Sequence, residues 1–362
     1  MRNSIYISLF LSFLFSFSLA YAEVVFSENF DAEPTGEYSK EQLAAAWNKP
    51  TWSSGPGEGR VFIVEGDLAY GDGKSLRVDY PANTYGPDAS GAQWKLNLGG
   101  TYDTLYASYK IMIPQGFDSV KGGKIPGLCG GQCNTGGNEP TGLDGFSTRM
   151  MWRNSSSGAD NLHTYLVSYL YYMDQVSRYG DDYYWATGLT PGWTFAESEG
   201  HVWLEPGQWH TVTTKIGINT PGEADGSLEA WFDGIKVLEQ NNIRYRAAGA
   251  DFAIDVFYFS TFFGGGDASW ATSKAESIYY DEFIISTVPT PDIAETPVSI
   301  NTLRNSHQDL RMVGEYVHYT GKETILLEIF GVDGRLLAKH RLEPSQSVKL
   351  SHHAYNYRVA NP

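Results

Sequence analysis

The chain has 362 residues, among them 39 Gly, 24 Tyr, 18 Phe and 10 Trp. This composition favours β-strands and turns over helices, and the length suffices for one large domain and one small one. The formal net charge of −16 argues against nucleic acid as a partner, so a site for an acidic polymer must be a local group of cations.

The N-terminus has the pattern of a secretory signal peptide. Arg2 precedes an apolar run over residues 5–19, and residues 20–22 (AYA) have the small-x-small cleavage pattern. We assign residues 1–22 to a signal peptide and expect a secreted, extracellular protein, with attachment to the cell surface as an alternative. No later stretch has the roughly 18 apolar residues of a membrane helix, so we expect no membrane span. We also expect a monomer.

Residues 23–286 have the rhythm of a β-sandwich. Short aromatic or β-branched runs alternate with clusters of Gly, Asn, Asp and Pro, which predicts an all-β, lectin-like (concanavalin-type) jelly roll. A short helix is expected over Lys40–Trp47. The clearest predicted strands are 105–113, 146–153, 164–173, 210–218, 227–238, 252–263 and 277–286.

A glycine-rich stretch over residues 121–133 (KGGKIPGLCGGQC) surrounds one lysine. Lys124 follows Gly123 and precedes the Ile125-Pro126 pair. Because glycine allows close approach of a ligand, we expect a shaped surface loop that presents an ammonium group. The alternative is a tight connection between strands whose lysine is merely solvated.

The two cysteines of the chain, Cys129 and Cys133, lie in the same stretch. In an oxidising compartment a small disulfide loop is their expected use. Free thiols are the next alternative, and a metal site ranks last because no His is nearby.

Two strands carry polar side chains on one face. Alternation along residues 146–153 places Ser147, Arg149 and Arg153 together, either on a solvated exterior or on a concave sheet. Along residues 164–173, the side chains on one face include Tyr165, Tyr169 and Tyr171. Three phenols need hydrogen-bond partners if they are buried, so we expect them in a wet groove.

A composition change follows the body. Residues 287–302 begin with TVPTPDIAETP, which predicts a Pro/Thr-rich linker. Residues 303–362 are less acidic, with a hairpin expected over 324–342 and a strand over 355–360. This region resembles the small C-terminal β-sandwich sorting domains of the type IX secretion system, which implies secretion machinery as a partner. Ala354 stands where that family has glycine, and a carbohydrate-binding or spacer module is the alternative.

Four motifs, in order, resemble polysaccharide lyase family 14, whose members are jelly-roll enzymes acting on alginate or glucuronan. They are KGGKIPGLCGG, GFSTRMMWR, YLYYMDQ and FFGGGDASWA. The resemblance spans residues 24–287 and implies an acidic polysaccharide substrate with no required cofactor. It implies catalytic roles for Lys124, Arg149, Tyr169 and Tyr171, and a place in the site for Ser147. We expect substrate contacts from Ser147 and also from Arg153, Tyr165 and Trp270.

Tyr165 is an alternative to one of the two catalytic tyrosines. Residues 154–164 lengthen the connection between the arginine strand and the tyrosine strand, so Tyr165 competes for one tyrosine role.

These residue types suit β-elimination at a 4-linked uronate. The carboxylate must be neutralised, the C5 proton removed and the departing O4 protonated, and Arg149 can form charge-assisted bonds to the carboxylate. We expect Lys124 as base or charge stabiliser and Tyr171 as acid, with one tyrosine serving both steps as an alternative. Lysine or tyrosine acts as a base near neutral pH only if burial or nearby positive charge lowers its pKa.

Two other functions use the same fold class. A glycoside hydrolase needs a carboxylate pair, for which Glu229, Asp233 and Glu282 are candidates, although nothing in the sequence pairs them. A non-catalytic protein could hold glycan on its aromatic residues. No catalytic metal is expected, but Glu28, Asp31 and the Asp281-Glu282 pair are candidates for a structural calcium ion.

Overall fold

The computed structural model describes most of the predicted body and parts of the C-terminal region. The described ranges are 24–154, 164–186, 202–293, 310–313, 316–320, 322, 324–330, 336–344, 346–349 and 356–360. The predicted signal peptide, residues 155–163 and residues 294–302 of the predicted linker lie outside them. Within these ranges, no helix has the length and apolar character needed to cross a membrane.

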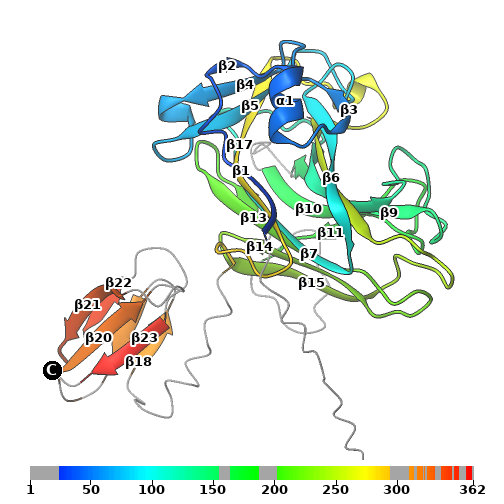
Figure 1. Ribbon diagram of the computed structural model, residues 1–362. Helices are drawn as coiled ribbons and strands as arrows, with labels where there is room; N and C mark the ends of the chain where they lie inside the picture. Colours follow the sequence, from blue (N-terminus) through cyan, green and yellow to red (C-terminus); the bar gives the residue numbers. More distant parts are fainter. Residues whose placement is uncertain are drawn as a thin grey trace, which may run out of the picture.

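The body is a sandwich of two antiparallel sheets, as the jelly-roll prediction requires (Figure 1). The first sheet has nine strands, and β1 pairs with β17 beside the main path. Its strands, in spatial order with β1 last, are β15 (Ile235–Ile243), β14 (Gly226–Phe232), β13 (His210–Gly217), β7 (Thr104–Met112), β17 (Glu276–Ser286), β5 (Lys74–Tyr80), β4 (Val61–Glu65), β2 (Gly36–Glu37) and β1 (Val24–Glu28).

The second sheet has eight strands, and β12 pairs with β10 beside the main path. Its strands, in spatial order with β12 last, are β11 (Asp181–Tyr184), β10 (Thr164–Tyr171), β9 (Gly145–Asn154), β8 (Gly123–Gly131), β16 (Ile254–Phe263), β6 (Ala92–Tyr102), β3 (Thr51–Ser54) and β12 (Trp203–Leu204). Two 3-10 turns, η1 (Gly66–Leu68) and η2 (Ala268–Trp270), complete the elements of the body.

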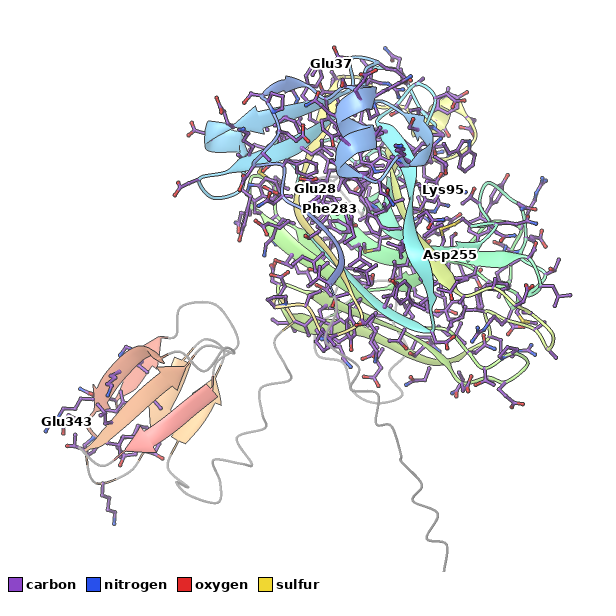
Figure 2. All side chains as sticks on the ribbon, in the orientation of Figure 1. Glu28, Glu37, Lys95, Asp255, Phe283 and Glu343 are labelled. Atoms are coloured by element: carbon purple, nitrogen blue, oxygen red, sulfur yellow. A yellow bond between two sulfur atoms is a disulfide. The ribbon has the colours of Figure 1, made fainter. Side chains whose placement is uncertain are left out.

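The core lies between the sheets and is strongly aromatic. Phe283 of β17, labelled in Figure 2, packs within 6 Å of Trp47, Tyr109 and Phe259. The rings of Trp94 and Phe259 stack at 3.8 Å between β6 and β16. The core side chains occupy the face of each strand that points toward the other sheet. In the eight-stranded sheet, the residues that alternate with them therefore lie on the outer face.

The helix prediction is confirmed. Helix α1 spans Lys40–Ala46, with Ser39 and Gln42 forming a capping box at its start. Trp47 at its end is fully buried in the core.

The prediction of a surface loop at residues 121–133 is wrong, because most of the stretch forms β8, in the interior of the eight-stranded sheet. Its glycines serve close strand packing: a Cβ at Gly127 would collide with the carbonyl of Thr148. Pro126 is tolerated because the pairing of β8 is irregular there, where a ladder N–H is not needed.

Two further differences concern strands. The predicted strand 227–238 is a hairpin of β14 and β15 around Asp233 and Gly234. The strands β4, β5 and β6 were not among the clearest in the sequence, although β6 has 11 residues.

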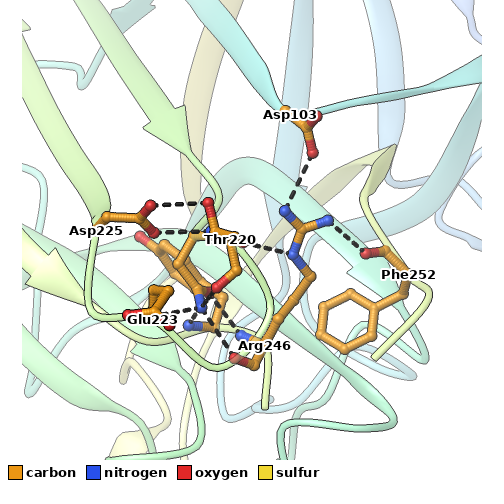
Figure 3. A network of polar contacts seen from close by, with 8 residues as sticks. Asp103, Thr220, Glu223, Asp225, Arg246 and Phe252 are labelled. Carbon is orange, nitrogen blue, oxygen red and sulfur yellow. Dashed lines mark hydrogen bonds and ion pairs between the residues drawn. The ribbon is translucent and has the colours of Figure 1, made fainter. Parts of the chain in front are cut away.

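A network of polar contacts joins two loops at one end of the sandwich (Figure 3). The guanidinium of Arg246 donates to the carbonyls of Asn219 and Phe252 and pairs with Asp103 at 3.2 Å. The connection from β15 to β16 is thereby held against the connection from β13 to β14.

The described start of the predicted linker lies on the body. Asp292 accepts a hydrogen bond from Ser108 (2.9 Å) and pairs with Lys110 (3.2 Å), both on β7. Thr290 and Ile293 are buried. These contacts extend the packed body beyond Ser286, the boundary assigned from composition.

The described C-terminal strands form two antiparallel three-stranded sheets. One contains β18 (Leu310–Val313), β19 (Tyr316–Tyr319) and β22 (Ser347–Lys349). The other contains β21 (Leu336–Leu342), β20 (Ile325–Phe330) and β23 (Asn356–Ala360). The β20–β21 hairpin and the terminal strand occupy the positions expected from the sequence.

Candidate active site

The outer face of the eight-stranded sheet brings the predicted catalytic residues together. In the pairing of β9 with β10, Arg149 lies opposite Tyr169 and Ser147 lies opposite Tyr171. Lys124 of β8 lies opposite Met151 of β9. Strand alternation predicted which side chains share a face, and the strand order places them side by side.

Lys124 is buried beside aromatic and sulfur groups. Its Nζ lies 2.7 Å from Met151 Sδ and 3.6 Å from the centroid of the Tyr169 ring. Burial lowers the pKa of Lys124 well below its ordinary value, and the charges of Arg149 and Arg153 lower it further. The amine is therefore poised to accept a proton under conditions in which an exposed lysine is fully charged.

Arg149 is the most deeply buried cation of this face, with 2% of its surface exposed. Its Nη1 donates to Ser260 Oγ (3.2 Å), and its guanidinium lies 5.1 Å from the centroid of the Tyr258 ring. Its Nε has no hydrogen-bond partner, and no carboxylate among the described residues forms an ion pair with it. Because a buried guanidinium without an anion is costly, this arrangement favours an anionic ligand.

Arg153, expected to bind substrate, has a partner within the protein. It forms a two-pronged ion pair with Asp182 of β11, at 3.0 and 2.8 Å. This pairing neutralises its charge, so it is a weaker anion site than Arg149.

The Tyr169 and Tyr171 side chains are buried, not in the wet groove expected from the sequence. The Tyr169 hydroxyl accepts the N–H of Gly180 (3.1 Å), and the Tyr171 hydroxyl accepts the N–H of Gly137 (3.0 Å). Burial raises the pKa of Tyr169, and the neighbouring Tyr171 raises it further. The raised pKa holds the proton on Tyr169, so a role as acid depends on its position beside Lys124 and not on this shift.

Ser147 and the cysteines hold the loop after β8. The Ser147 hydroxyl donates to the carbonyl of Asn134 (2.7 Å), and Cys129 and Cys133 form a disulfide with their Cα atoms 5.1 Å apart. This loop also contains Gly137, which donates to Tyr171. Ser147 is fully buried, so in this structure it supports the loop and offers no surface to a ligand.

Tyr165 and Trp270 lie at the edge of the catalytic group. Tyr165 pairs with Arg153 in register and stacks on Tyr184 at 6.1 Å. Trp270 lies 5.9 Å from the Arg153 guanidinium and is half-buried. Both remain candidates for substrate contact.

The carboxylates considered for hydrolysis belong to the other sheet, with Glu229 on β14, Glu282 on β17 and Asp233 in the turn between β14 and β15. Glu229 is paired with Lys215 and Lys236, and Asp233 is paired with His210. Within the described ranges, no three His, Cys, Asp or Glu side chains are arranged to hold a metal ion.

Asp281, one of the calcium candidates, is buried and has two hydrogen bonds. It accepts the Ser75 hydroxyl (2.6 Å) and the N–H of Glu282 (2.7 Å). Burial raises the pKa of Asp281 to about 7, and the charges of Glu282 and Asp31 contribute.

This pKa predicts a pH-dependent stability. Between 3.8 and about 7 the folded state keeps a proton that the unfolded state has released, so this contribution is present at low pH and is lost as pH rises through 7. Asp281→Asn should therefore raise the Tm more at pH 8 than at pH 5. The exposed Asp88→Asn is the matched charge control, and an equal gain at both pH values would contradict the prediction.

The sequence did not single out several residues that complete the site. Ser260 and Tyr258 of β16 contact Arg149, Met151 contacts Lys124, and Asp182 neutralises Arg153. The alternation of β16 could have indicated that Tyr258 and Ser260 share a face, but not that this face meets Arg149.

Comparisons with known proteins support the fold and identify the family. A family model described as Polysaccharide lyase 14 matches residues 69–283. Among solved structures, alginate lyase Aly36B is 26% identical with a TM-score of 0.58, covering 72% of this chain and 95% of that chain. The PL-14 alginate lyase from Aplysia kurodai is 22% identical with a TM-score of 0.55, covering 73% and 99%. No curated protein matches the sequence significantly.

Two variants of Aly36B were solved with sugars. One, in which a lysine and a methionine are replaced by alanine, holds an alginate trisaccharide; it is 26% identical to this chain with a TM-score of 0.59, covering 73% and 98%. The other lacks the same lysine and a tyrosine, and holds an alginate tetrasaccharide.

Proposed function

The chain belongs to polysaccharide lyase family 14, and we propose that it cleaves a 4-linked polyuronate, alginate first among the candidates, by β-elimination. The observation that carries this proposal is the buried Arg149 guanidinium, whose Nε has no hydrogen-bond partner and which has no carboxylate partner among the described residues. In a protein with a net charge of −16, a cation left unpaired in this way favours an acidic ligand. The likeness to Aly36B supports alginate.

Arg149 is proposed to bind the uronate carboxylate. Its planar fork can form two charge-assisted hydrogen bonds, and these strengthen as negative charge moves onto the carboxylate during proton removal. The bond to Ser260 and the Tyr258 ring hold the guanidinium in place.

Lys124 is proposed to be the base. Its neutral amine takes the C5 proton, the C5–H electrons form the C4–C5 double bond, and the C4–O4 bond breaks. The lowered pKa of Lys124 is the property that this role requires. The residue types replaced in the sugar-bound Aly36B variants, lysine, methionine and tyrosine, are those that meet around Lys124 here.

Tyr169 is proposed to be the acid that protonates O4, in place of Tyr171 as expected from the sequence. Tyr169 contacts Lys124 directly and is 6% exposed, whereas Tyr171 is 1% exposed. The two rings meet edge to face at 5.6 Å, so Tyr171 supports the position of Tyr169.

The three tyrosines should differ when each is replaced by phenylalanine. Tyr169→Phe should lower kcat on alginate by about 100-fold or more, because a positioned acid is worth that much. Tyr171→Phe should cost less, and Tyr165→Phe least, because Tyr165 lies four residues along the strand from Tyr169. A larger loss for Tyr165→Phe than for the other two would show that the wrong tyrosines are assigned.

Ultraviolet absorbance during digestion tests the reaction and the substrate. β-Elimination creates a double bond conjugated to the carboxylate, so absorbance should rise with alginate as substrate. The panel should contain mannuronate-rich and guluronate-rich alginate, glucuronan and a neutral glucan. A rise with glucuronan alone would overturn alginate, and new reducing ends without absorbance would indicate hydrolysis.

We also propose that the protein is exported, with residues 1–22 as signal peptide and residues 303–362 as a sorting domain. The sequence patterns support this, as does the β-structure of the described C-terminal residues. In a host with a type IX system, the full chain should release lyase activity into the medium, and a chain ending at Ile293 should not. Equal release by both chains would favour a binding or spacer module.

A further inference from the structure

An exposed tryptophan lies on the same sheet face as the candidate active site. Trp52 of β3 is 57% exposed and is the most exposed tryptophan of the described residues. Its ring stacks on Tyr258 at 6.1 Å with an angle of 25° between the planes. Because its outer surface faces solvent, the indole offers an apolar face of the kind that packs against the C–H groups of a pyranose.

The backbone that carries this ring has an uncommon conformation. Trp52 has a φ of 57°, in the left-handed region that non-glycine residues rarely adopt. The pairing of β3 with β6 is also irregular between Thr51 and Ser54. Core packing does not account for this strain, because the ring lies outside the core, and strained positions gather at functional sites.

A lysine beside the tryptophan supplies positive charge. Lys95 of β6, labelled in Figure 2, places its Nζ 4.2 Å from the centroid of Trp52 and 5.2 Å from that of Tyr258. Burial lowers the pKa of Lys95, and the positive charge of Arg149 adds to this effect. No carboxylate of the described residues pairs with Lys95, so its charge is available to an anion.

Tyr258 connects this pair with the candidate active site. Its ring contacts the cations of both Arg149 and Lys95, and its hydroxyl donates to Gln93 (2.7 Å). Arg149 on β9 and Lys95 on β6 are separated by the strands β8 and β16, and their cations lie 5.1 and 5.2 Å from the centroid of the same Tyr258 ring. A polymer lying across the strands can therefore meet two separate cations with two of its carboxylates.

We propose that Trp52 and Lys95 form a second uronate-binding site, away from the cleaved bond, where Trp52 packs against a pyranose ring and Lys95 binds its carboxylate. This site rests on the proposed function in placing the reacting uronate at Arg149. It makes the enzyme favour acidic chains that extend beyond the reacting uronate, because only these contact both Arg149 and the Trp52–Lys95 pair.

The dependence of activity on chain length tests this site. The variants are Trp52→Ala and Lys95→Met, with Trp52→Phe and Lys95→Arg as matched controls that keep the ring and the charge. The measured quantity is the ratio of kcat/KM for alginate polymer to kcat/KM for the shortest alginate oligosaccharide cleaved. Loss of the ring contact in Trp52→Ala, or of the charge-assisted contact in Lys95→Met, should lower this ratio about tenfold, while the controls keep most of it.

Each outcome decides between the site and a purely structural role. An unchanged ratio in Trp52→Ala and Lys95→Met, or an equal loss on polymer and oligosaccharide, would overturn the site. A lowered ratio in Trp52→Ala alone would show that the site has a ring contact but that Lys95 does not bind a carboxylate, contrary to the proposal. The ratio of the two kcat/KM values is measured in enzymes that keep Lys124 and Arg149. It therefore tests the second site even if the Lys124 and Arg149 variants contradict their proposed catalytic roles.

Discussion

Replacing Lys124 by alanine should reduce turnover of alginate by at least 100-fold while the protein stays folded. A positioned base is worth roughly 10²–10⁴-fold in rate, and no second described lysine contacts both Met151 and Tyr169. Because the side chain is buried, Lys124→Met should be made alongside, since methionine fills the space without the amine. The Tm of each variant, measured with kcat, separates lost chemistry from lost stability.

The neighbouring Lys121 is the matched control for this substitution. Lys121 is exposed and contacts Ser269 and the Trp270 ring, not the catalytic group. Lys121→Ala should keep kcat near that of the wild type. Retention of more than about a tenth of the wild-type kcat by Lys124→Met would remove Lys124 from the role of base.

The pH profile gives a second check on the same role. A base acts only when deprotonated, so wild-type kcat/KM should rise with pH through the lowered pKa of Lys124. Any residual activity of Lys124→Met should lack this rise. The same rise in both enzymes would mean that another group controls it.

Replacing Arg149 by lysine should remove most activity although the charge is kept. A planar guanidinium can bind a carboxylate through two parallel hydrogen bonds, and a lysine ammonium cannot reproduce that geometry. The bond to Ser260 would also be disturbed. We expect kcat to fall more than about tenfold, because charge-assisted bonds that strengthen in the transition state are worth several kcal/mol.

Arg153→Lys is the matched control, because Arg153 lies on the same face but is paired with Asp182. Its kcat should fall less than that of Arg149→Lys. A normal kcat with only a raised KM in Arg149→Lys would show that Arg149 binds substrate and transition state equally. That result would contradict its role in holding the developing charge.

Local patterns predicted the parts of the site that depend on one strand at a time. The two-residue alternation of a β-strand is a property of its backbone, so it showed that Ser147, Arg149 and Arg153 share a face. The same rule grouped Tyr165, Tyr169 and Tyr171. The structure agrees with both groupings, and pairing of β9 with β10 sets them opposite each other.

The same local reasoning was wrong around Lys124, because glycine is common both in loops and in closely packed strands. The stretch around Lys124 has the composition of a loop, but its glycines allow neighbouring strands to pack closely around β8. Only the positions of the Thr148 carbonyl and the Trp152 ring distinguish these uses, and both belong to a different strand. The burial that lowers the pKa of Lys124 has the same origin, because its surroundings come from other strands.

By itself the sequence determined the all-β class, the family resemblance and the residue types available for β-elimination. The tertiary structure decided which cations are free for an anion: Arg153 is neutralised by Asp182, 29 residues away, whereas Arg149 meets Ser260, 111 residues away, and no described carboxylate. Trp52, Lys95 and Tyr258 likewise come from three separate strands. Contacts of this kind depend on strand order and register, which the packing of the whole core sets and no local pattern encodes.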